Sequence, residues 1–472
     1  MVQIPIISGI FAEISPDFRV SYPCNFIPTP RDTGINQGYL RPADGIVQHD
    51  TPTGPSVGPG LPRGGIVWNG IEYRVMGTKL CSVAADGTVT ELGDVGTGGQ
   101  CAFDYSFDRL AINSGDRLYY WNGALTQVTD PDLLNVNDVV WVDGYFMTTD
   151  GEFLIVTELT DPTQINPLKY GSAEADPDPI LALVKLRNEV YALNRFTIEV
   201  FDNVGGDLFP FQRNEGAQIQ KGTVGRDACC NYIETIAFVG SGRNQPPGIF
   251  LGENGQDVKI STQEIDQLLL GYSETELAAV ILEARNDRSH ELLYVHLPDR
   301  TLVYDGAASK ELQLPCWHVL TTAIDGFAQY KARDMLWCYD SWRVADPAST
   351  KLGRLVRDIG THWGEKVRWE FGTSIIYNEG KGAIVSALEL VALTGSVTFG
   401  QSPTISTSYT IDGVTWSQPR YLGVGGFGQR VKRLCWWRQG TMRNWRIQRF
   451  QGTSDAHIVI ARLEAALEPL AY

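Results

Sequence analysis

A β-rich unit recurs about seven times between Gly64 and Asp358, and this recurrence restricts the possible folds more than any other feature of the chain. Each unit has short runs of alternating apolar residues separated by turn residues, as in Gly65–Val75 and Arg117–Leu125. Strand-and-turn units spaced roughly 40 residues apart are typical of a β-propeller, in which each unit forms one blade. The units begin near Gly64, Gly98, Asn135, Pro179, Gly222, Leu277 and Ala323. The sequence therefore predicts an all-β propeller of six or seven blades.

Turn dipeptides support this reading, because Asn-Gly and Asp-Gly pairs favour two-residue β-hairpins. Such pairs stand at Asn69-Gly70, Asn122-Gly123, Asp143-Gly144, Asn254-Gly255 and Asp305-Gly306, among other places. Two short segments break the β pattern. Ser261–Glu264 and Ser273–Glu276 each fit a capping box, in which a Ser hydroxyl and a Glu carboxylate cap the start of a helix. The second helix is expected to continue from Leu277 to Ala284, so the propeller has a short helical insertion near 261–285.

Three domains are expected along the chain. Residues 1–62 are interrupted by ten prolines and still carry many aromatic and aliphatic residues, which predicts an extended N-terminal arm that packs on its own domain or on a neighbouring subunit. Residues 63–362 form the propeller. Long alternating runs then appear at Ala383–Val391, Thr404–Ile411 and Ala456–Arg462, which predict a C-terminal β-sandwich over residues 363–472.

The charge of the chain argues against a sequence-independent grip on nucleic acid, which needs clustered Lys and Arg. The net charge is -16, with 39 basic and 55 acidic residues. The eight cysteines show no CxxC spacing, and neither a secretory signal nor a membrane-spanning run is recognised. We therefore expect free thiols, assembly in a reducing cytoplasm and no membrane.

No chemistry is predicted from the motifs. The six histidines lack metal-site spacing, and the chain has neither an HExxH motif nor a P-loop. Gly54–Gly58 fits the letters of a nucleophile elbow but lies in a proline-rich linker, and Gly423–Gly428 fits a dinucleotide fingerprint but precedes a strand-like run. We therefore assign no catalytic, cofactor-binding or metal-binding residue, and no cofactor.

Basic residues gather on two predicted strands near the end of the chain. The candidate interface residues are Arg430, Lys432, Arg438, Arg443, Arg446 and Arg449. On a strand, Arg430 and Lys432 share a face, whereas Arg446 and Arg449 do not. Two readings remain open: a solvated strand surface, or an interface for an acidic partner or for the acidic body of a neighbouring subunit.

One segment resembles a known family. Asp287–Asp305, followed by Trp317, resembles the packaged DNA stabilisation protein of short-tailed bacteriophages, a tail accessory factor also called the tail hub or nozzle. Weaker matching points are Gly38–Arg41 near the N-terminus, Gln220–Gly222, and the helix start at Tyr272–Glu276. The proline-rich stretch before Gly64 and the last eight residues depart from the family pattern.

The resemblance implies a homo-oligomer, expected to be a hexamer, beneath the portal-adaptor ring of the virion tail. Such a ring extends the DNA channel, lets genomic DNA pass through its lumen without sequence-specific binding, and helps to keep the packaged genome inside. It also offers attachment surfaces for tailspikes or tail fibres and for a tail needle or plug. Two alternatives from other classes are a propeller glycosidase and a glycan-binding module, each acting on host surface polysaccharide.

Overall fold

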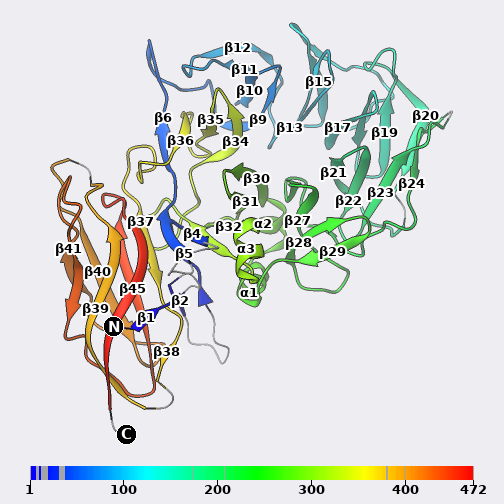
Figure 1. Cartoon of the computed structure of the whole chain (residues 1–472). Coiled ribbons are helices and arrows are strands. Elements are labelled where there is room, and N and C mark those ends of the chain that lie inside the picture. The colour runs from blue at the N-terminus through cyan, green and yellow to red at the C-terminus, as the bar shows by residue number, and fades with distance from the viewer. Residues whose placement is uncertain are drawn as a thin grey trace.

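The computed structural model describes residues 2–6, 10–11, 20–30, 38–173, 175–206, 208–378, 381–397 and 399–470. These residues form two β-domains, a propeller and a sandwich, which lie side by side in Figure 1. The all-β fold class predicted from the sequence is therefore confirmed.

The propeller has seven blades within the described residues. The first blade contains β9 (Pro62–Trp68), β10 (Ile71–Met76), β11 (Lys79–Val83) and β12 (Val89–Asp94); the second contains β13 (Ala102–Tyr105), β14 (Leu110–Ser114), β15 (Arg117–Trp121) and β16 (Leu125–Gln127); and the third contains β17 (Asp138–Val142), β18 (Tyr145–Thr149), β19 (Phe153–Thr157) and β20 (Ile165–Ser172). The fourth blade contains β21 (Ile180–Leu186), β22 (Glu189–Asn194), β23 (Ile198–Asn203) and β24 (Phe211–Arg213), and the fifth contains β25 (Gly222–Thr223) and β26 (Cys229–Tyr232) beside β27 (Thr235–Ser241), β28 (Gly248–Glu253) and β29 (Gln256–Lys259). The sixth blade contains β30 (Ile281–Asp287), β31 (His290–His296), β32 (Thr301–Asp305) and β33 (Trp317–Leu320), and the seventh contains β34 (Arg333–Cys338), β35 (Ser341–Ala345), β36 (Leu352–Val356) and β6 (Gly45–Gln48).

The seventh blade closes the ring with strands from both ends of the propeller sequence. Its first three strands are β34 to β36, and its fourth is β6, which pairs antiparallel with β36 through Ile46 and Leu355. The sequence predicts an arm over residues 1–62, which include β6, and gives no sign of this exchange. A strand from the start of the chain thus fastens the last blade.

Apolar side chains pack between every pair of consecutive blades. Trp68 and Leu110 belong to the cluster between the first and second blades, and Cys81 and Ala345 belong to the cluster between the first and the seventh. The other five junctions hold comparable clusters. Burial of apolar surface at all seven junctions makes the ring continuous.

Three helices occur in the described residues: α1 (Gln263–Leu270), α2 (Glu274–Ala278) and α3 (Gly306–Leu312). The capping box predicted at Ser273 is present, but α1 starts after Thr262 without a side-chain cap, because the Ser261 hydroxyl donates to Asp266 instead. The helix predicted to reach Ala284 stops at Ala278, since Ile281 onward is needed as the inner strand of the sixth blade. None of these helices combines the length and apolarity needed to span a bilayer.

The predicted hairpin turn at Asp305-Gly306 is wrong. Asp305 is the N-cap of α3, and its carboxylate accepts a hydrogen bond from the backbone N–H of Ala308. Capping of a helix start and formation of a hairpin use the same residue types, so the dipeptide alone could not separate the two outcomes.

The sandwich also draws strands from both ends of the chain. One sheet joins β1 (Val2–Ile4), β4 (Phe26–Pro30) and β5 (Gly38–Pro42) to β39 (Ala383–Leu393), β42 (Leu434–Trp437), β43 (Thr441–Met442) and β45 (Val459–Pro469). The facing sheet contains β37 (Arg368–Gly372), β38 (Ile376–Tyr377), β40 (Thr404–Thr410), β41 (Arg420–Gly423) and β44 (Trp445–Thr453). Phe26, Leu40, Phe371 and Phe450 meet in the core between the sheets. Two short pairs, β2 (Ile10–Phe11) with β3 (Val20–Ser21) and β7 (Asp50–Thr51) with β8 (Gly54–Pro55), complete the strands.

Asn25 links the two domains directly. Its side-chain amide donates to the carbonyl of Thr321, beside the sixth blade, and to that of Arg368 in the sandwich, while its side-chain oxygen accepts from the Thr321 N–H. The preceding Cys24 exchanges backbone hydrogen bonds with Glu370 of β37. The N-terminal segment therefore acts as a strap between propeller and sandwich.

Candidate interaction surface

The axis of the propeller is occupied by protein groups. Arg226, between β25 and β26, donates to the carbonyls of Gln100 and Asn137 and to the side chain of Asn113, and it pairs with Asp227. The remaining void at this position is about 230 Å³, which is smaller than the roughly 300–1,000 Å³ of typical small-molecule sites. A nucleic acid duplex has no path along this axis.

Buried acids near the axis tie one blade to the next. Asp138 of β17 accepts a 2.8 Å hydrogen bond from the N–H of Leu183 in β21, and burial raises the pKa of its carboxyl to about 7. Glu283 of β30 likewise accepts a 2.6 Å bond from the N–H of Asp334 in β34. The described residues contain no group of three or more His, Cys, Asp or Glu placed to hold a metal ion. These carboxyls are used as structural acceptors.

The six candidate interface residues divide by depth. Arg430, Lys432, Arg438 and Arg443 are exposed, and none of the four has a side-chain hydrogen bond or ion pair among the described residues. The predicted strand containing Arg430 and Lys432 starts only at Leu434, so these two residues lie in the preceding loop rather than on one strand face. Four of the six side chains are therefore available to a partner.

Arg446 is part of the sandwich interior. It is 1% exposed, its guanidinium lies 3.7 Å from the centre of the Tyr409 ring, and it donates to the side-chain oxygen of Gln448 and the carbonyl of Gln439. Burial lowers the pKa of Arg446 to about 10. This side chain cannot meet a partner in the folded chain.

Arg449 is half-buried beside it. Its guanidinium stacks 4.0 Å from the Trp416 ring centre and donates to the Ser408 hydroxyl at 3.2 Å. The alternation of residues along β44 does not predict these contacts of Arg446 and Arg449. Their aromatic partners, Tyr409 and Trp416, belong to the separate β40–β41 hairpin.

Arg430, Lys432 and Arg438 lie beside the open side of the sandwich, where the edge strands β41 and β42 of the two sheets meet, and Arg443 follows β43. Arg420 bridges these edges: its guanidinium donates to the carbonyls of Trp437 and Arg438, and its own carbonyl accepts from the Trp436 indole. Arg420 is not among the six candidates predicted from the sequence. A signal was present, since residues 391–450 contain eight basic residues and Asp412 as their single acid.

Exposed aromatic and aliphatic side chains accompany these cations. Tyr421 and Trp437 stand on the edge strands with 67% and 63% of their surface exposed, and Phe427 and Val431 project from the loop that leads to β42. We call the set of Arg420, Tyr421, Phe427, Arg430, Val431, Lys432, Trp437 and Arg438 the edge face. Aromatic side chains and arginines are enriched in protein–protein interfaces, so the edge face has the composition of a docking surface.

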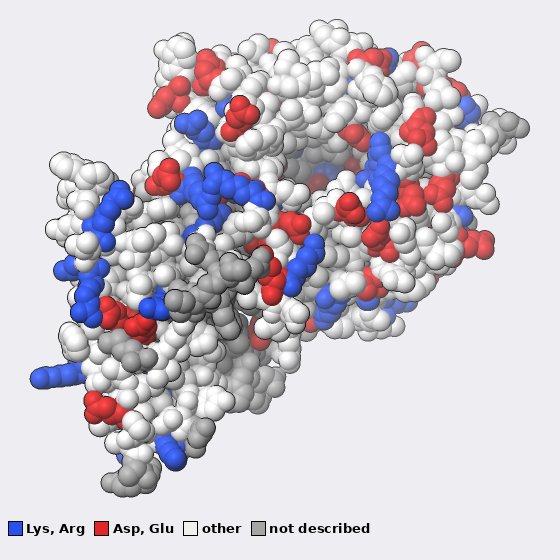
Figure 2. Space-filling view, viewed as in Figure 1, with Lys and Arg blue, Asp and Glu red and all other residues white. Residues whose placement is uncertain are grey.

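The acidic residues lie elsewhere. Residues 363–472 have 12 basic and 8 acidic residues, a net charge of +4, and residues 1–362 carry the remaining net charge of -20. On the face shown in Figure 2, acidic side chains spread over the propeller, and basic side chains line the outer side of the sandwich. Negative charge is therefore concentrated in residues 1–362, and the C-terminal region is net positive.

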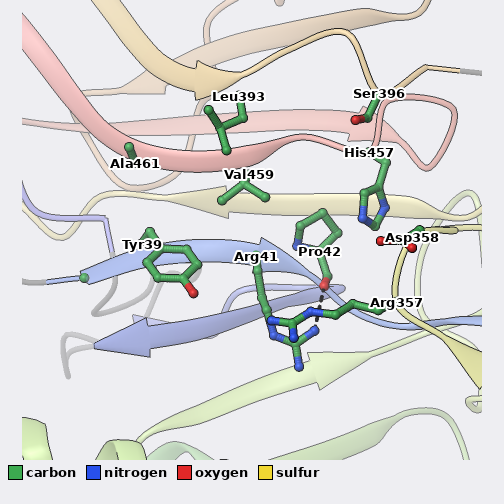
Figure 3. A pocket seen from close by; sticks show the side chains of 11 residues that line it. Tyr39, Arg41, Pro42, Arg357, Asp358, Leu393, Ser396, His457, Val459 and Ala461 are labelled. Carbon is green, nitrogen blue, oxygen red and sulfur yellow. Dashed lines mark hydrogen bonds between the residues drawn. The ribbon is translucent and has the colours of Figure 1, made fainter. Parts of the chain in front are cut away.

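A pocket of about 510 Å³ lies where the two domains meet (Figure 3). Tyr39, Leu393 and Val459 line its sandwich side, and Arg357 and Asp358 follow the last propeller strand. Figure 3 shows His457 pointing toward Asp358. Burial lowers the pKa of His457, so its imidazole is neutral at pH 7 and offers no fixed charge.

Comparisons with known proteins cover both domains. A family model described as "Bacteriophage P22 Gp10, beta-propeller" matches residues 2–360, and one described as "Bacteriophage P22 Gp10, beta-sandwich" matches residues 368–468. The tail hub protein gp10 of Salmonella phage P22 is 25% identical over 466 residues, which cover 93% of this chain and 94% of that protein.

Solved structures give weaker likenesses. The WD40 domain of Neurospora crassa Pan2 is 12% identical with a TM-score of 0.41, covering 66% of this chain and 94% of that one. PorZ of Porphyromonas gingivalis is 12% identical with a TM-score of 0.37, covering 78% and 46%. The family assignment does not depend on them. The matches to both domains confirm the resemblance seen in the sequence: this chain belongs to the bacteriophage P22 Gp10 family of structural tail hub proteins.

Proposed function

We propose that this chain is the repeating subunit of a ring in the tail of a short-tailed phage, assembled in the host cytoplasm. The ring extends the DNA channel beneath the portal adaptor and helps to retain the packaged genome. The observation that supports this best is the end-to-end similarity to the P22 tail hub protein, which spans 93% of this chain.

The structure favours a channel formed between subunits. Because Arg226 and its partners fill the propeller axis, DNA must pass through a lumen that several copies surround. A net charge of -16 means that the subunits do not hold the DNA backbone. DNA then slides through the ring without sequence-specific binding, as ejection requires.

The edge face supplies the contact between neighbouring subunits in this proposal. In a closed ring, each interface joins two different patches, so a basic aromatic patch on the sandwich of one copy can meet an acidic propeller surface on the next. The proposed ring is a hexamer. Its further partners are a portal-adaptor protein, tailspikes or fibres, and a needle or plug.

Negative-stain electron microscopy of the purified protein, alone and with the portal adaptor of the same phage, tests the proposal. Wild-type protein should form rings that stack on the adaptor. The Arg430→Glu/Lys432→Glu double variant should fold normally but lose rings. An Arg117→Glu/Lys381→Glu variant, with the same charge change at exposed positions outside the edge face, should keep them.

Two results would contradict the proposal. One is a monomer that never joins the adaptor. The other is a purified monomer that cleaves or binds host polysaccharide as its main activity, which would favour the glycosidase or glycan-binding alternative.

A further inference from the structure

Another recess lies where the sixth and seventh blades meet, apart from the edge face. Its volume is about 750 Å³, within the roughly 300–1,000 Å³ range of ligand sites. Three segments line it: the turn after β30 with Arg288, the β34–β35 hairpin with Trp337, Asp340 and Trp342, and the end of β36 with Arg354 and Arg357. We call it the blade recess.

The floor of the blade recess is electrically balanced. Arg285, 4% exposed, pairs with Asp44 at 2.7 Å and with Asp287 at 2.6 Å, and Asp44 also pairs with Arg41 at 2.9 Å. The charges of these two cations and two carboxylates balance. They fix the base of the recess and leave no net charge for a ligand.

The walls, in contrast, carry uncompensated positive charge. Arg288, Arg354 and Arg357 are exposed, and none of them forms an ion pair with another described residue. Asp340 is the one lining acid outside the balanced floor. Figure 2 shows basic side chains gathered between β30 and β36. Three guanidinium groups around one concave site attract an anionic group.

Two tryptophans form an aromatic wall. Trp337 of β34 and Trp342 of β35 are register partners with ring centres 5.4 Å apart in an edge-to-face arrangement. The guanidinium of Arg285 supports Trp342 from below at 5.4 Å. Trp337 keeps 53% of its surface exposed. An indole held by its neighbours with a free face is a platform for a flat apolar surface.

From these features we propose that the blade recess binds an acidic saccharide. The C–H face of a sugar ring stacks on the Trp337 indole, and its acid group pairs with the guanidinium of Arg354 or Arg357. Hydroxyl groups of the same ring donate to the Asp340 carboxylate or bond with Ser341 and Asn286, which also line the site. This one ligand class uses the aromatic, cationic and neutral polar walls together.

Other anionic ligands use less of the site. A peptide strand cannot add to β36, because β36 is already paired on both sides by β35 and β6. A nucleic acid needs a long basic track, and the blade recess offers three free cations on a chain with a net charge of -16. Peptides and nucleic acids are therefore outcomes that the test must separate from saccharide binding.

Isothermal titration of the full-length protein with trigalacturonic acid is the direct experiment, with neutral maltotriose as the matched ligand. We expect binding of the acidic sugar in the millimolar range or tighter and at least tenfold weaker binding of maltotriose. Trp337→Ala and Arg354→Gln/Arg357→Gln should each weaken binding at least tenfold. Trp437→Ala and Arg430→Gln/Lys432→Gln, which make the same changes on the edge face, should bind like wild type.

The outcomes are decisive in both directions. No titration signal with trigalacturonic acid, equal binding of maltotriose, or unchanged binding by the recess variants would overturn the inference. Tighter, recess-dependent binding of hexaglutamate or of single-stranded DNA would also overturn it in favour of another class. The inference is independent of ring assembly, because the recess variants should still form rings and edge-face variants should still bind the sugar.

Discussion

Arginine has opposite roles in the sandwich according to its depth. Arg446 is enclosed by Tyr409, Gln448 and Gln439 and acts as a packing element, whereas Arg430 projects into solvent sixteen residues earlier in the same basic stretch. A buried guanidinium must have its donors satisfied, since an unpaired buried cation is costly. The number of basic residues in the sequence is therefore larger than the number of positive charges exposed to a partner.

Replacing these two arginines should separate stability from assembly. Arg446→Ala removes buried packing and leaves the Gln439 carbonyl and the Gln448 side chain without a donor, so we expect a loss of about 2–4 kcal/mol in unfolding free energy. Arg430→Ala should change stability by less than about 0.5 kcal/mol. Urea denaturation of both variants measures this, and equal losses would contradict the assigned depths.

Buried neutral histidines should make the fold sensitive to acid. His318 is enclosed in the sixth blade, neither of its ring nitrogens has a hydrogen-bond partner among the described residues, and burial lowers its pKa to about 3. Asp305 and Asp44 act to raise this pKa, and His290 and Arg41 act to lower it. Below the ordinary pKa of about 6.5, the unfolded chain takes up a proton that the folded chain refuses. Stability is therefore complete above that pH and falls as the pH drops toward 3.

As the pH falls through that window, each such histidine lowers the free energy of unfolding by about 1.4 kcal/mol per pH unit. His318→Leu removes one of them, so the loss of unfolding free energy between pH 7.5 and pH 5 should be about 2 kcal/mol smaller than in wild type. Urea titrations at the two pH values provide the measurement. An identical pH dependence in the variant would show that His318 is protonated in the folded state.

At the scale of elements, local pattern and distant pairing differ in how well sequence reveals them. The predicted unit starts at Pro179 and Gly222 lie next to the observed first strands β21 and β25, because turn residues and alternation are local signals. The pairing of β6 with β36 joins residues about 300 positions apart, and no local pattern encodes it. The candidate site shows the same limit: the basic stretch was visible, but burial of Arg446 depends on Tyr409 from another strand.

The strap formed by the N-terminal segment should hold without its covalent link. A protease site inserted at the exposed Thr53, in the β7–β8 hairpin, separates β1 to β7 from the rest of the chain. Since β4, β5 and β6 pair with or pack on the remaining strands, the cut halves should co-elute on gel filtration and separate only in denaturant. Release of the small fragment in native buffer would contradict this. The additional change Ile46→Asp, at a fully buried position of β6, should loosen the nicked protein.

For the whole molecule, the uneven charge has a consequence for assembly. In the proposed ring, residues 1–362, with a net charge of -20, face the C-terminal region of +4 of a neighbouring copy, and this attraction favours one orientation of contact over the rest. Such attraction between exposed charges weakens when salt shortens the screening length to about 3 Å at 1 M. The exposed aromatic groups of the edge face add contact area that salt does not weaken.

Ring formation should therefore decline with salt without vanishing. We expect the protein concentration needed for half-assembly, measured by sedimentation velocity, to rise at least tenfold between 0.05 and 0.5 M NaCl, since charge complementarity contributes strongly to such contacts. Trp437→Ala should raise that concentration at every salt level by a similar factor, because it removes apolar contact and no charge. Arg430→Gln/Lys432→Gln should instead flatten the salt dependence. Rings that assemble equally well at both salt concentrations would show that the subunits associate through surfaces other than the edge face.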